Sequence, residues 1–240
     1  MRLGLGASLS QVSRSTGISR SVLRTWQLNQ GAYSAWATAR QSCPLQDVLS
    51  DGEAYAHLLG LYLGDGCISQ HRRGVYHLRI VCDAKYPHLL QECAASMRAV
   101  LPNKVGFVKA PGCIVVQSYS RHWPCVFPQV GPGPKHRRSI VLADWQTAVV
   151  AEHPGRFIRG LFHADGCRVV NWTVQRVSGA DKRYEYPRYM LSNESDDIMR
   201  LAEWALDLLG VAHRRARPNS LSVARKASVA IMDQVVGPKS

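Results

Sequence analysis

The chain has 240 residues, of which 46% are apolar, and carries a formal net charge of +13 with an isoelectric point near 9.8. This length allows two small domains or one larger one, and the apolar fraction is sufficient for a core. So large a positive charge favours an anionic partner. Nucleic acid is the first candidate, and a membrane surface or a ribosome is the alternative.

No stretch approaches the roughly 18 apolar residues of a membrane-spanning helix, and residues 1–24 lack the apolar core of a secretory signal. We therefore expect an intracellular, cytoplasmic protein that does not bind membranes. The seven cysteines contain no Cys-x-x-Cys pair, so neither a disulfide framework nor a structural zinc site has its usual spacing. Buried free thiols are the favoured interpretation, and a zinc site is the alternative.

Residues 8–31 are predicted to form two short helices around a turn. Gly17 suits a left-handed turn backbone, and Ser19 is a good N-cap for a second helix that continues to Trp26. This pattern is typical of a helix-turn-helix, whose second helix enters the major groove of DNA by its first residues. The alternative is an ordinary helical hairpin with a solvated basic face. The residues expected to face DNA are Ser19, Arg20, Ser21 and Arg24.

Residues 32–53 are rich in small and polar residues and are interpreted as a linker. Beyond them, two segments resemble each other at a spacing of 100 residues. Residues 58–67 read LLGLYLGDGC and residues 158–167 read IRGLFHADGC, so Asp65 and Asp165 occupy matching positions. The repeat continues: Ser118-Tyr119-Ser120-Arg121 recurs as Ser222-Val223-Ala224-Arg225, and Gln129-Val130-Gly131-Pro132 recurs loosely as Val235-Val236-Gly237-Pro238.

The two decapeptides resemble the LAGLIDADG motif of homing endonucleases, over residues 54–240. The resemblance implies an α+β fold, namely a pseudo-dimeric pair of αββαββα domains at residues 54–142 and 143–240. A small all-α helix-turn-helix at residues 1–31 would precede them. Small residues one helical turn apart allow two helix backbones to approach closely, and the family packs its two motif helices in this way. The residues concerned are Gly60, Gly64, Gly160 and Ala164.

The expected elements follow that order along the chain. An alternating strand at residues 75–82 precedes a helix at 87–100, and a strand pair at 105–120 turns at Pro111-Gly112. Strands then flank Gly179, and an amphipathic helix at 195–209 ends at Gly210. The polar and basic residues expected to contact DNA are Arg72, Arg73, Arg79, Arg168, Gln175, Arg176, Arg183 and Arg188.

Asp65 and Asp165 each end an apolar helix, where the helix dipole disfavours a negative charge. If the helices pack together, the two carboxylates also repel each other, and a divalent cation relieves both effects. The resemblance implies Mg²⁺ or Mn²⁺ bound by the two aspartates, with the backbone carbonyls of Gly64 and Ala164 within reach. The alternative is that each Asp-Gly is only a turn after a buried helix.

A basic residue near each acid would stabilise a phosphate undergoing hydrolysis. By repeat position we expect Arg121 and Arg225 in this role, with Lys226 close behind. Arginine departs from the family, which commonly has lysine here. His163 is a second departure; it either touches the metal site or, as we favour, packs at the helix interface.

The resemblance implies a site-specific endonuclease that binds double-stranded DNA as a monomer and cuts both strands. A transcription regulator that keeps the fold without cutting is the alternative, although such proteins usually lose one or both acids. An RNA maturase would share the fold, and basic clusters do not distinguish it. The ends of the chain lack an intein signature, so we expect a free-standing protein.

Overall fold

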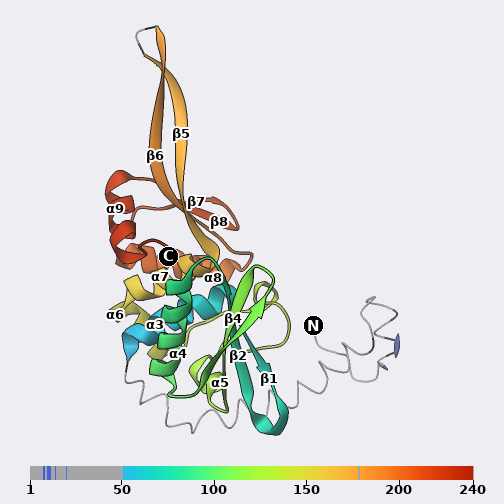
Figure 1. Cartoon of the computed structure of the whole chain (residues 1–240). Helices are drawn as coiled ribbons and strands as arrows, with labels where there is room; N and C mark the ends of the chain where they lie inside the picture. Colours follow the sequence, from blue (N-terminus) through green and yellow to red (C-terminus); the bar gives the residue numbers. More distant parts are fainter. Residues whose placement is uncertain are drawn as a thin grey trace.

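The computed structural model describes residues 51–177 and 179–239, together with Ser8, Ser10, Gln11, Arg14 and Arg20. Arg20 is exposed; Ser19, Ser21 and Arg24, the other expected DNA contacts of the helix-turn-helix, lie outside the described residues. From residue 51 onward the described chain contains two repeats with the same order of elements (Figure 1).

The first repeat runs from the motif helix α3 to the short helix η4. Helix α3 begins inside the expected linker, where the Asp51 carboxylate accepts a hydrogen bond of 2.9 Å from the backbone N–H of Ala54. The elements are α3 (Gly52–Asp65), β1 (Gly66–Gln70), η3 (Arg72–Gly74), β2 (Tyr76–Asp83), α4 (Pro87–Val100), β3 (Val105–Ala110), β4 (Cys113–Ser120), α5 (Trp123–Val126) and η4 (Lys135–Arg137).

Helix α6 (Asp144–Glu152) connects the first repeat to the second, which runs from α7 to α9. Ser195 caps helix α8. Gly210 adopts a left-handed backbone just beyond the end of the helix, where the sequence predicted that the helix stops. The elements are α7 (Pro154–Asp165), β5 (Gly166–Val177), β6 (Ala180–Ser192), α8 (Asp196–Leu208), β7 (Arg214–Arg217), β8 (Ser220–Val223) and α9 (Lys226–Val235).

Each repeat contains one four-stranded antiparallel sheet. The strand orders are β1-β2-β4-β3 and β5-β6-β8-β7, so corresponding strands occupy corresponding places. In both sheets the second strand of the first hairpin pairs with the last strand of the second hairpin. The predicted α+β class and the succession helix, hairpin, helix, hairpin, helix are confirmed.

The two motif helices α3 and α7 pack directly against each other, with almost no space between their backbones. A Cβ atom added at Gly60 would overlap the carbonyl oxygen of Phe157, and one added at Gly160 would overlap the carbonyl oxygen of His57. The expectation that small residues allow a close helix crossing is confirmed. Any larger side chain at these glycines would force the backbones apart.

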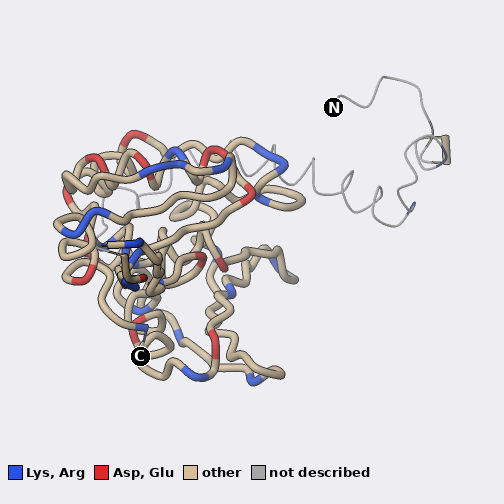
Figure 2. The backbone as a smooth tube through the Cα atoms, turned by 90° about the horizontal axis from the view of Figure 1, so that it is seen from above, with Lys and Arg blue, Asp and Glu red and all other residues tan. Residues whose placement is uncertain are grey.

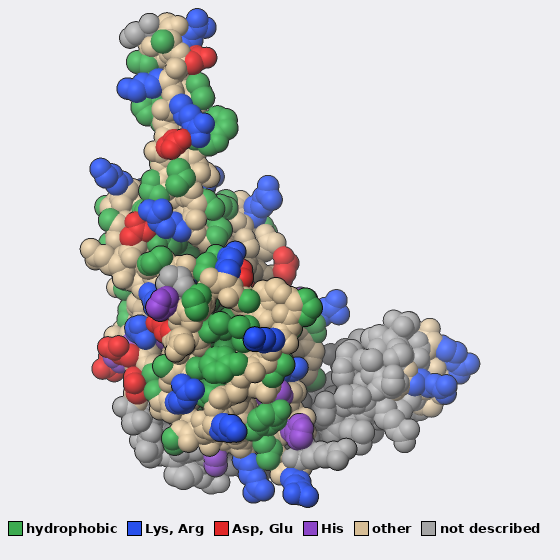
Figure 3. Space-filling model, in the orientation of Figure 1, with side chains coloured by type: hydrophobic (Ala, Val, Ile, Leu, Met, Phe, Trp, Pro, Cys, Tyr) green, Lys and Arg blue, Asp and Glu red, His purple; other side chains and the backbone are tan. Residues whose placement is uncertain are grey.

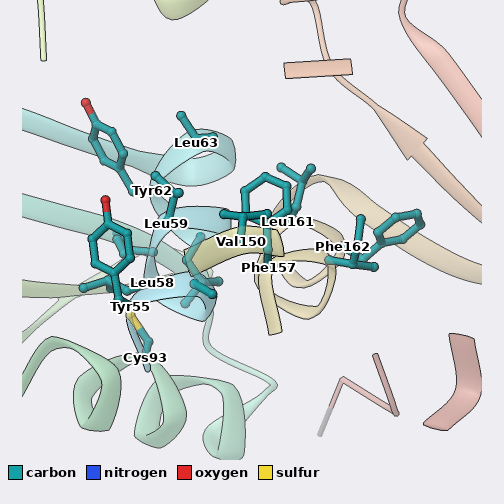
Figure 4. Packing of buried hydrophobic residues seen from close by; sticks show 14 of the residues in the cluster. Tyr55, Leu58, Leu59, Tyr62, Leu63, Cys93, Val150, Phe157, Leu161 and Phe162 are labelled. Atoms are coloured by element: carbon teal, nitrogen blue, oxygen red, sulfur yellow. The ribbon is translucent and has the colours of Figure 1, made fainter. Parts of the chain in front are cut away.

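Helix α3 is buried on nearly all sides because it lies between α7, α4, α6 and strands of the first sheet. Figure 4 shows side chains of α3 near the aromatic and aliphatic side chains of α7 and Cys93 of α4. One continuous core therefore holds both repeats together. The ends of α3 and α7 are fixed relative to each other by this packing. The labelled side chains of the two motif helices are Tyr55, Leu58, Leu59, Tyr62, Leu63, Phe157, Leu161 and Phe162.

The β5–β6 hairpin is much longer than its counterpart in the first repeat and projects from the body of the molecule (Figure 1). Strand β6 pairs with β8 only over Tyr189–Ser192, so the outer part of the hairpin is a two-stranded ribbon. We call residues 169–177 and 180–188 the arm. Val170 and Trp172 in the arm are 57% and 58% exposed, which is unusual for such large apolar side chains.

Six of the seven cysteines lie in the described residues, and none of these six forms a disulfide. Cys82 and Cys93 are buried as expected, whereas Cys67 and Cys167 are exposed, because strand alternation turns them away from the core. None of the described helices has the length and apolar run that crossing a bilayer requires.

Candidate active site at the ends of the motif helices

Asp65 and Asp165 are the last residues of α3 and α7, and the packing of these helices brings them together. A Cβ atom added at Gly64, next to Asp65, would lie 3.1 Å from the Asp165 Oδ2 atom. Each acid directly precedes the first strand of its sheet. Two segments 100 residues apart in the sequence thus present their carboxylates at one place.

Both carboxyl groups are harder to ionise than a free aspartate. Desolvation by the surrounding chain raises the pKa of Asp65, and the negative charge of Asp165 raises it further. Desolvation also raises the pKa of Asp165, while a hydrogen bond of 2.6 Å from the Asn193 amide partly offsets this. Two such acids side by side are the donor set that a hard divalent cation prefers.

Lys135 is the nearest basic residue to the end of α3. Its ammonium donates to the backbone carbonyls of Tyr62, Leu63 (2.7 Å) and Gly64 (2.9 Å), all in the last turn of that helix. Burial lowers the pKa of Lys135 to about 8, and the charges of the two aspartates oppose this shift. The carbonyl of Gly64, expected to reach a metal, is therefore hydrogen-bonded to an ammonium group.

Lys239 takes a similar place beside the end of α7. Its ammonium donates to the carbonyl of Gly166 at 2.6 Å. Its positive charge partly offsets the rise in the pKa of both aspartates. A cavity of about 230 Å³ is lined by Asp65, Lys239 and Lys85, among others. Polar groups of both signs thus line a space beside Asp65 that water or a small anion can enter.

The sequence contains a signal for these two lysines. Gly133-Pro134-Lys135 recurs as Gly237-Pro238-Lys239 at a spacing of 104 residues, the same spacing that relates Arg121 to Arg225. The repeat therefore pairs Gly133-Pro134, and not the expected Gly131-Pro132, with Gly237-Pro238. Gly133 and Gly237 both adopt left-handed backbones, with φ of 76° and 66°, which supports this pairing.

Arg121, Arg225 and Lys226 lie on the surface, at the end of β4 and the start of α9. Among the described residues, the basic groups that shift the pKa of either aspartate are Lys135 and Lys239, and these three residues are not among them. The structure thus brings lysines, not the expected arginines, to the acids. Ala164 packs at the crossing, where its Cβ atom faces Gly64.

His163 is buried between the helices and does not touch the aspartates through any described hydrogen bond. Its Nε2 atom lies 3.0 Å from the carbonyl oxygen of Val236, and its Nδ1 atom faces Glu92. The favoured expectation, a packed interface histidine, agrees with this position.

The first sheet has one face on the core and one open face. Leu78 and Ile80 are buried, whereas the alternating residues of β2 point to the open face. There His77 lies 2.8 Å from the Gln117 side chain and stacks on Tyr119, with ring centroids 4.1 Å apart. Arg79 is on the same face, directly opposite Gln117. This face offers hydrogen-bonding groups and rings together.

The expected DNA contacts of the second sheet divide between two faces. Strand register places Gln175 and Arg188 on the same face as Cys167, and Arg168, Arg176 and Arg183 on the other. The arm is solvated on both faces, and Figure 3 shows Lys and Arg side chains along it.

Arg168 and Arg183 form ion pairs within the chain. Arg168 binds the Asp233 carboxylate at 2.8 and 3.1 Å, and Arg183 binds Glu185 at 2.7 Å and lies over the ring of Trp172. In the first repeat, Arg73 is exposed and adopts a left-handed backbone, and the side chain of Arg72 lies outside the described part.

No family model matches the chain, and no curated protein matches it. Among solved structures, a mesophilic variant of the homing endonuclease I-DmoI has a TM-score of 0.48 at 13% identity, covering 77% of this chain and 96% of that one. The LAGLIDADG meganuclease I-AabMI bound to uncleaved DNA has a TM-score of 0.47 at 13% identity, covering 75% and 83%. The N-terminal LAGLIDADG domain of WhiA has 0.44 at 10% identity, covering 82% and 89%. These similarities are too distant to assign a family or an activity to this chain.

Proposed function

We propose that this protein is a LAGLIDADG-type endonuclease that binds double-stranded DNA and hydrolyses one phosphodiester bond in each strand. The observation that carries the proposal is the pair of helix-terminal carboxylates, Asp65 and Asp165, with Lys135 and Lys239 beside them. Both acids belong to one chain, so the protein would act as a monomer.

DNA would lie along the open face of the first sheet and along the arm. The basic residues occur over much of the described backbone (Figure 2), and phosphate contacts would supply most of the affinity. The arm is a two-stranded ribbon, a shape that the major groove admits. Its Gln175 and Lys182 stand opposite each other in register and would offer hydrogen bonds to base edges.

The aspartates would hold Mg²⁺ or Mn²⁺, which polarises the scissile phosphate and activates water. Their raised pKa values reflect the unfavourable burial of two negative charges, and bound cations would relieve this. The ammonium groups of Lys135 and Lys239 would stabilise the negative charge that develops on the phosphate.

The second candidate is a DNA-binding regulator that does not cut. Lys135 favours it, because an ammonium group close to both acids already neutralises part of their charge and would compete with a metal ion. The two candidates share DNA binding and differ only in hydrolysis.

The test begins with selection of a binding site from a randomised duplex library, followed by incubation of that site with Mg²⁺ or Mn²⁺. The wild type should bind and cut, whereas Asp65→Asn with Asp165→Asn should bind with similar affinity and not cut. Specific binding with no cutting by the wild type in either metal would favour the regulator. Preference for a single-stranded or structured RNA over every duplex would reject both.

A further inference from the structure

A second cluster of side chains with metal-ligating atoms lies in the helix interface, and one of them, His163, stands two residues before Asp165. His57 of α3, Glu92 of α4 and His163 of α7 each offer a ligand atom, and these atoms all lie within 4.8 Å of one another. The His57 Nε2 atom is 3.9 Å from Glu92 Oε1, and the His163 Nδ1 atom is 4.0 Å from Glu92 Oε2. Three different helices therefore converge on one point.

The hydrogen bonds on the far side of the two rings leave one nitrogen of each ring facing this point. The His163 Nε2 atom lies 3.0 Å from the Val236 carbonyl, which only accepts, so Nε2 carries the proton and Nδ1 is the free acceptor. The His57 Nδ1 atom is 2.9 Å from the Ser96 hydroxyl oxygen, which leaves Nε2 as the inward-facing atom.

Both inward nitrogens lack a partner among the described residues, although each is deeply buried. The side chain of His57 is 0% exposed and that of His163 is 2% exposed, and neither His57 Nε2 nor His163 Nδ1 forms a hydrogen bond. Buried polar atoms normally have a partner, since leaving one unpaired costs about 1–3 kcal/mol.

We propose that His57, Glu92 and His163 bind one Zn²⁺ ion that links α3, α4 and α7. Two imidazole nitrogens and a carboxylate are a known zinc ligand set. In a tetrahedral site, zinc–ligand bonds of about 2.0–2.2 Å place two ligand atoms about 3.4 Å apart. The two distances to Glu92 exceed this separation by roughly 0.5 Å, which small side-chain rotations would close. A cation would satisfy both inward nitrogens at once, with the Glu92 carboxylate as its third ligand.

Glu92 is oriented for this role by Arg159, which donates to its two carboxylate oxygens at 2.8 and 2.9 Å. Each carboxylate oxygen has a second lone pair, so an ion and a guanidinium can share it. The positive charges of Arg159 and Arg156 oppose a second cation. The imidazoles therefore decide the affinity, which favours Zn²⁺ over Mg²⁺.

The test uses metal-free full-length protein carrying Asp65→Asn and Asp165→Asn, so that the proposed catalytic site contributes no carboxylate ligand. Titration with Co²⁺ should give one equivalent bound with visible d–d absorption of a four-coordinate ion, and Zn²⁺ should displace it. At 100 times its Kd, Zn²⁺ should raise Tm by roughly 5 °C. Absence of both signals would overturn the proposal and leave water as the occupant, whatever the outcome of the cleavage assay.

The ligands are then tested one at a time. His163→Gln should lower the Zn²⁺ affinity by on the order of 100-fold or more, and Ser96→Ala, which only positions His57, should lower it by about 10-fold. His88→Gln, on the exposed side of α4, should leave it unchanged. If His163→Gln does not fold, anomalous scattering at the zinc edge from wild-type crystals tests whether Zn²⁺ occupies the site. A zinc peak among His57, Glu92 and His163 supports the site, and its absence from zinc-soaked crystals overturns it.

Discussion

The two repeats share their core plan and differ at their surfaces. Both sheets have the same strand order, both motif helices end in Asp-Gly, and both acids have a lysine from a Gly-Pro-Lys segment nearby. The first hairpins differ, because β5 and β6 contain 12 and 13 residues where β1 and β2 contain 5 and 8. The packed centre follows the same plan in both repeats, whereas the solvent-facing arm belongs to one repeat only.

The symmetry of the centre is also incomplete around the acids. Register pairs Gly66 with Ile80 and Gly166 with Leu191, so Asn193 corresponds to Cys82. An amide donates to Asp165 at this position, while the first repeat has a buried thiol there. Side chains at the crossing of α3 and α7 contact both repeats, so their size is constrained by both. Side chains around each aspartate can differ between the two repeats. The two strands of a bound duplex would therefore meet unequal surroundings.

The largest effect is expected at the symmetric crossing itself. Gly160→Val should destabilise the protein by about 3 kcal/mol or prevent folding, because its side chain would overlap the His57 backbone. The measurement is urea unfolding followed by circular dichroism. Gly106→Ala is the control, since its Cβ atom would meet only the Gln117 side chain at 3.7 Å. Equal stability of both variants would contradict a glycine-dependent crossing.

The next largest effect is on the cleavage rate, and it should distinguish Lys135 from Lys239. Lys135→Met should slow cleavage by about 100-fold, because Lys135 is the more deeply buried lysine and its charge acts more strongly on both acids than that of Lys239. Lys239→Met should slow it by about 10-fold, and Arg121→Ala should have little effect. Single-turnover rates on a selected duplex, with nicking of each strand measured separately, test this order. A greater loss in Arg121→Ala than in either lysine variant would restore the role first expected for the arginine.

The arm offers a way to test the asymmetry of DNA binding. Arg176→Ala with Lys182→Ala should weaken binding by about 10-fold and reduce the slope of log Kd against log salt by about 1 per lost phosphate contact. Lys109→Ala, at the end of β3 in the first repeat, should change both quantities less. Fluorescence anisotropy at several salt concentrations measures the Kd and its dependence on salt. Identical salt slopes for the wild type and the arm variant would mean that the arm does not contact DNA.

The smallest effect is a pH dependence of stability. The folded state raises the pKa of both aspartates above the usual 3.8. Protonation of these carboxyl groups therefore makes its full contribution to the free energy of unfolding below about pH 4. This contribution is lost as the pH rises through the raised pKa values. In metal-free protein, Asp65→Asn should be more stable than the wild type at pH 7, and the difference should shrink toward pH 4. Thermal unfolding measures it, and a difference that grows toward acid pH would contradict the burial of these charges.

The sequence by itself determined the repeat, the strand and helix succession and the identity of the paired acids. Pro87 marked the start of α4, and Ser195 and Gly210 marked the ends of α8. These signals depend on interactions between residues a few positions apart, and sequence spacing displays them directly. The close helix crossing also followed from small residues one turn apart.

Only the tertiary structure decided which side chains meet across long stretches of chain. Lys135 reaches the end of α3 from 71 to 73 residues away, and Arg168 pairs with Asp233 over 65 residues. The cluster of His57, Glu92 and His163 requires three helices to converge, and these residues share no motif or spacing. Such partners depend on how whole elements pack, because a side chain's neighbours in a core are set by helix and sheet placement and not by local periodicity.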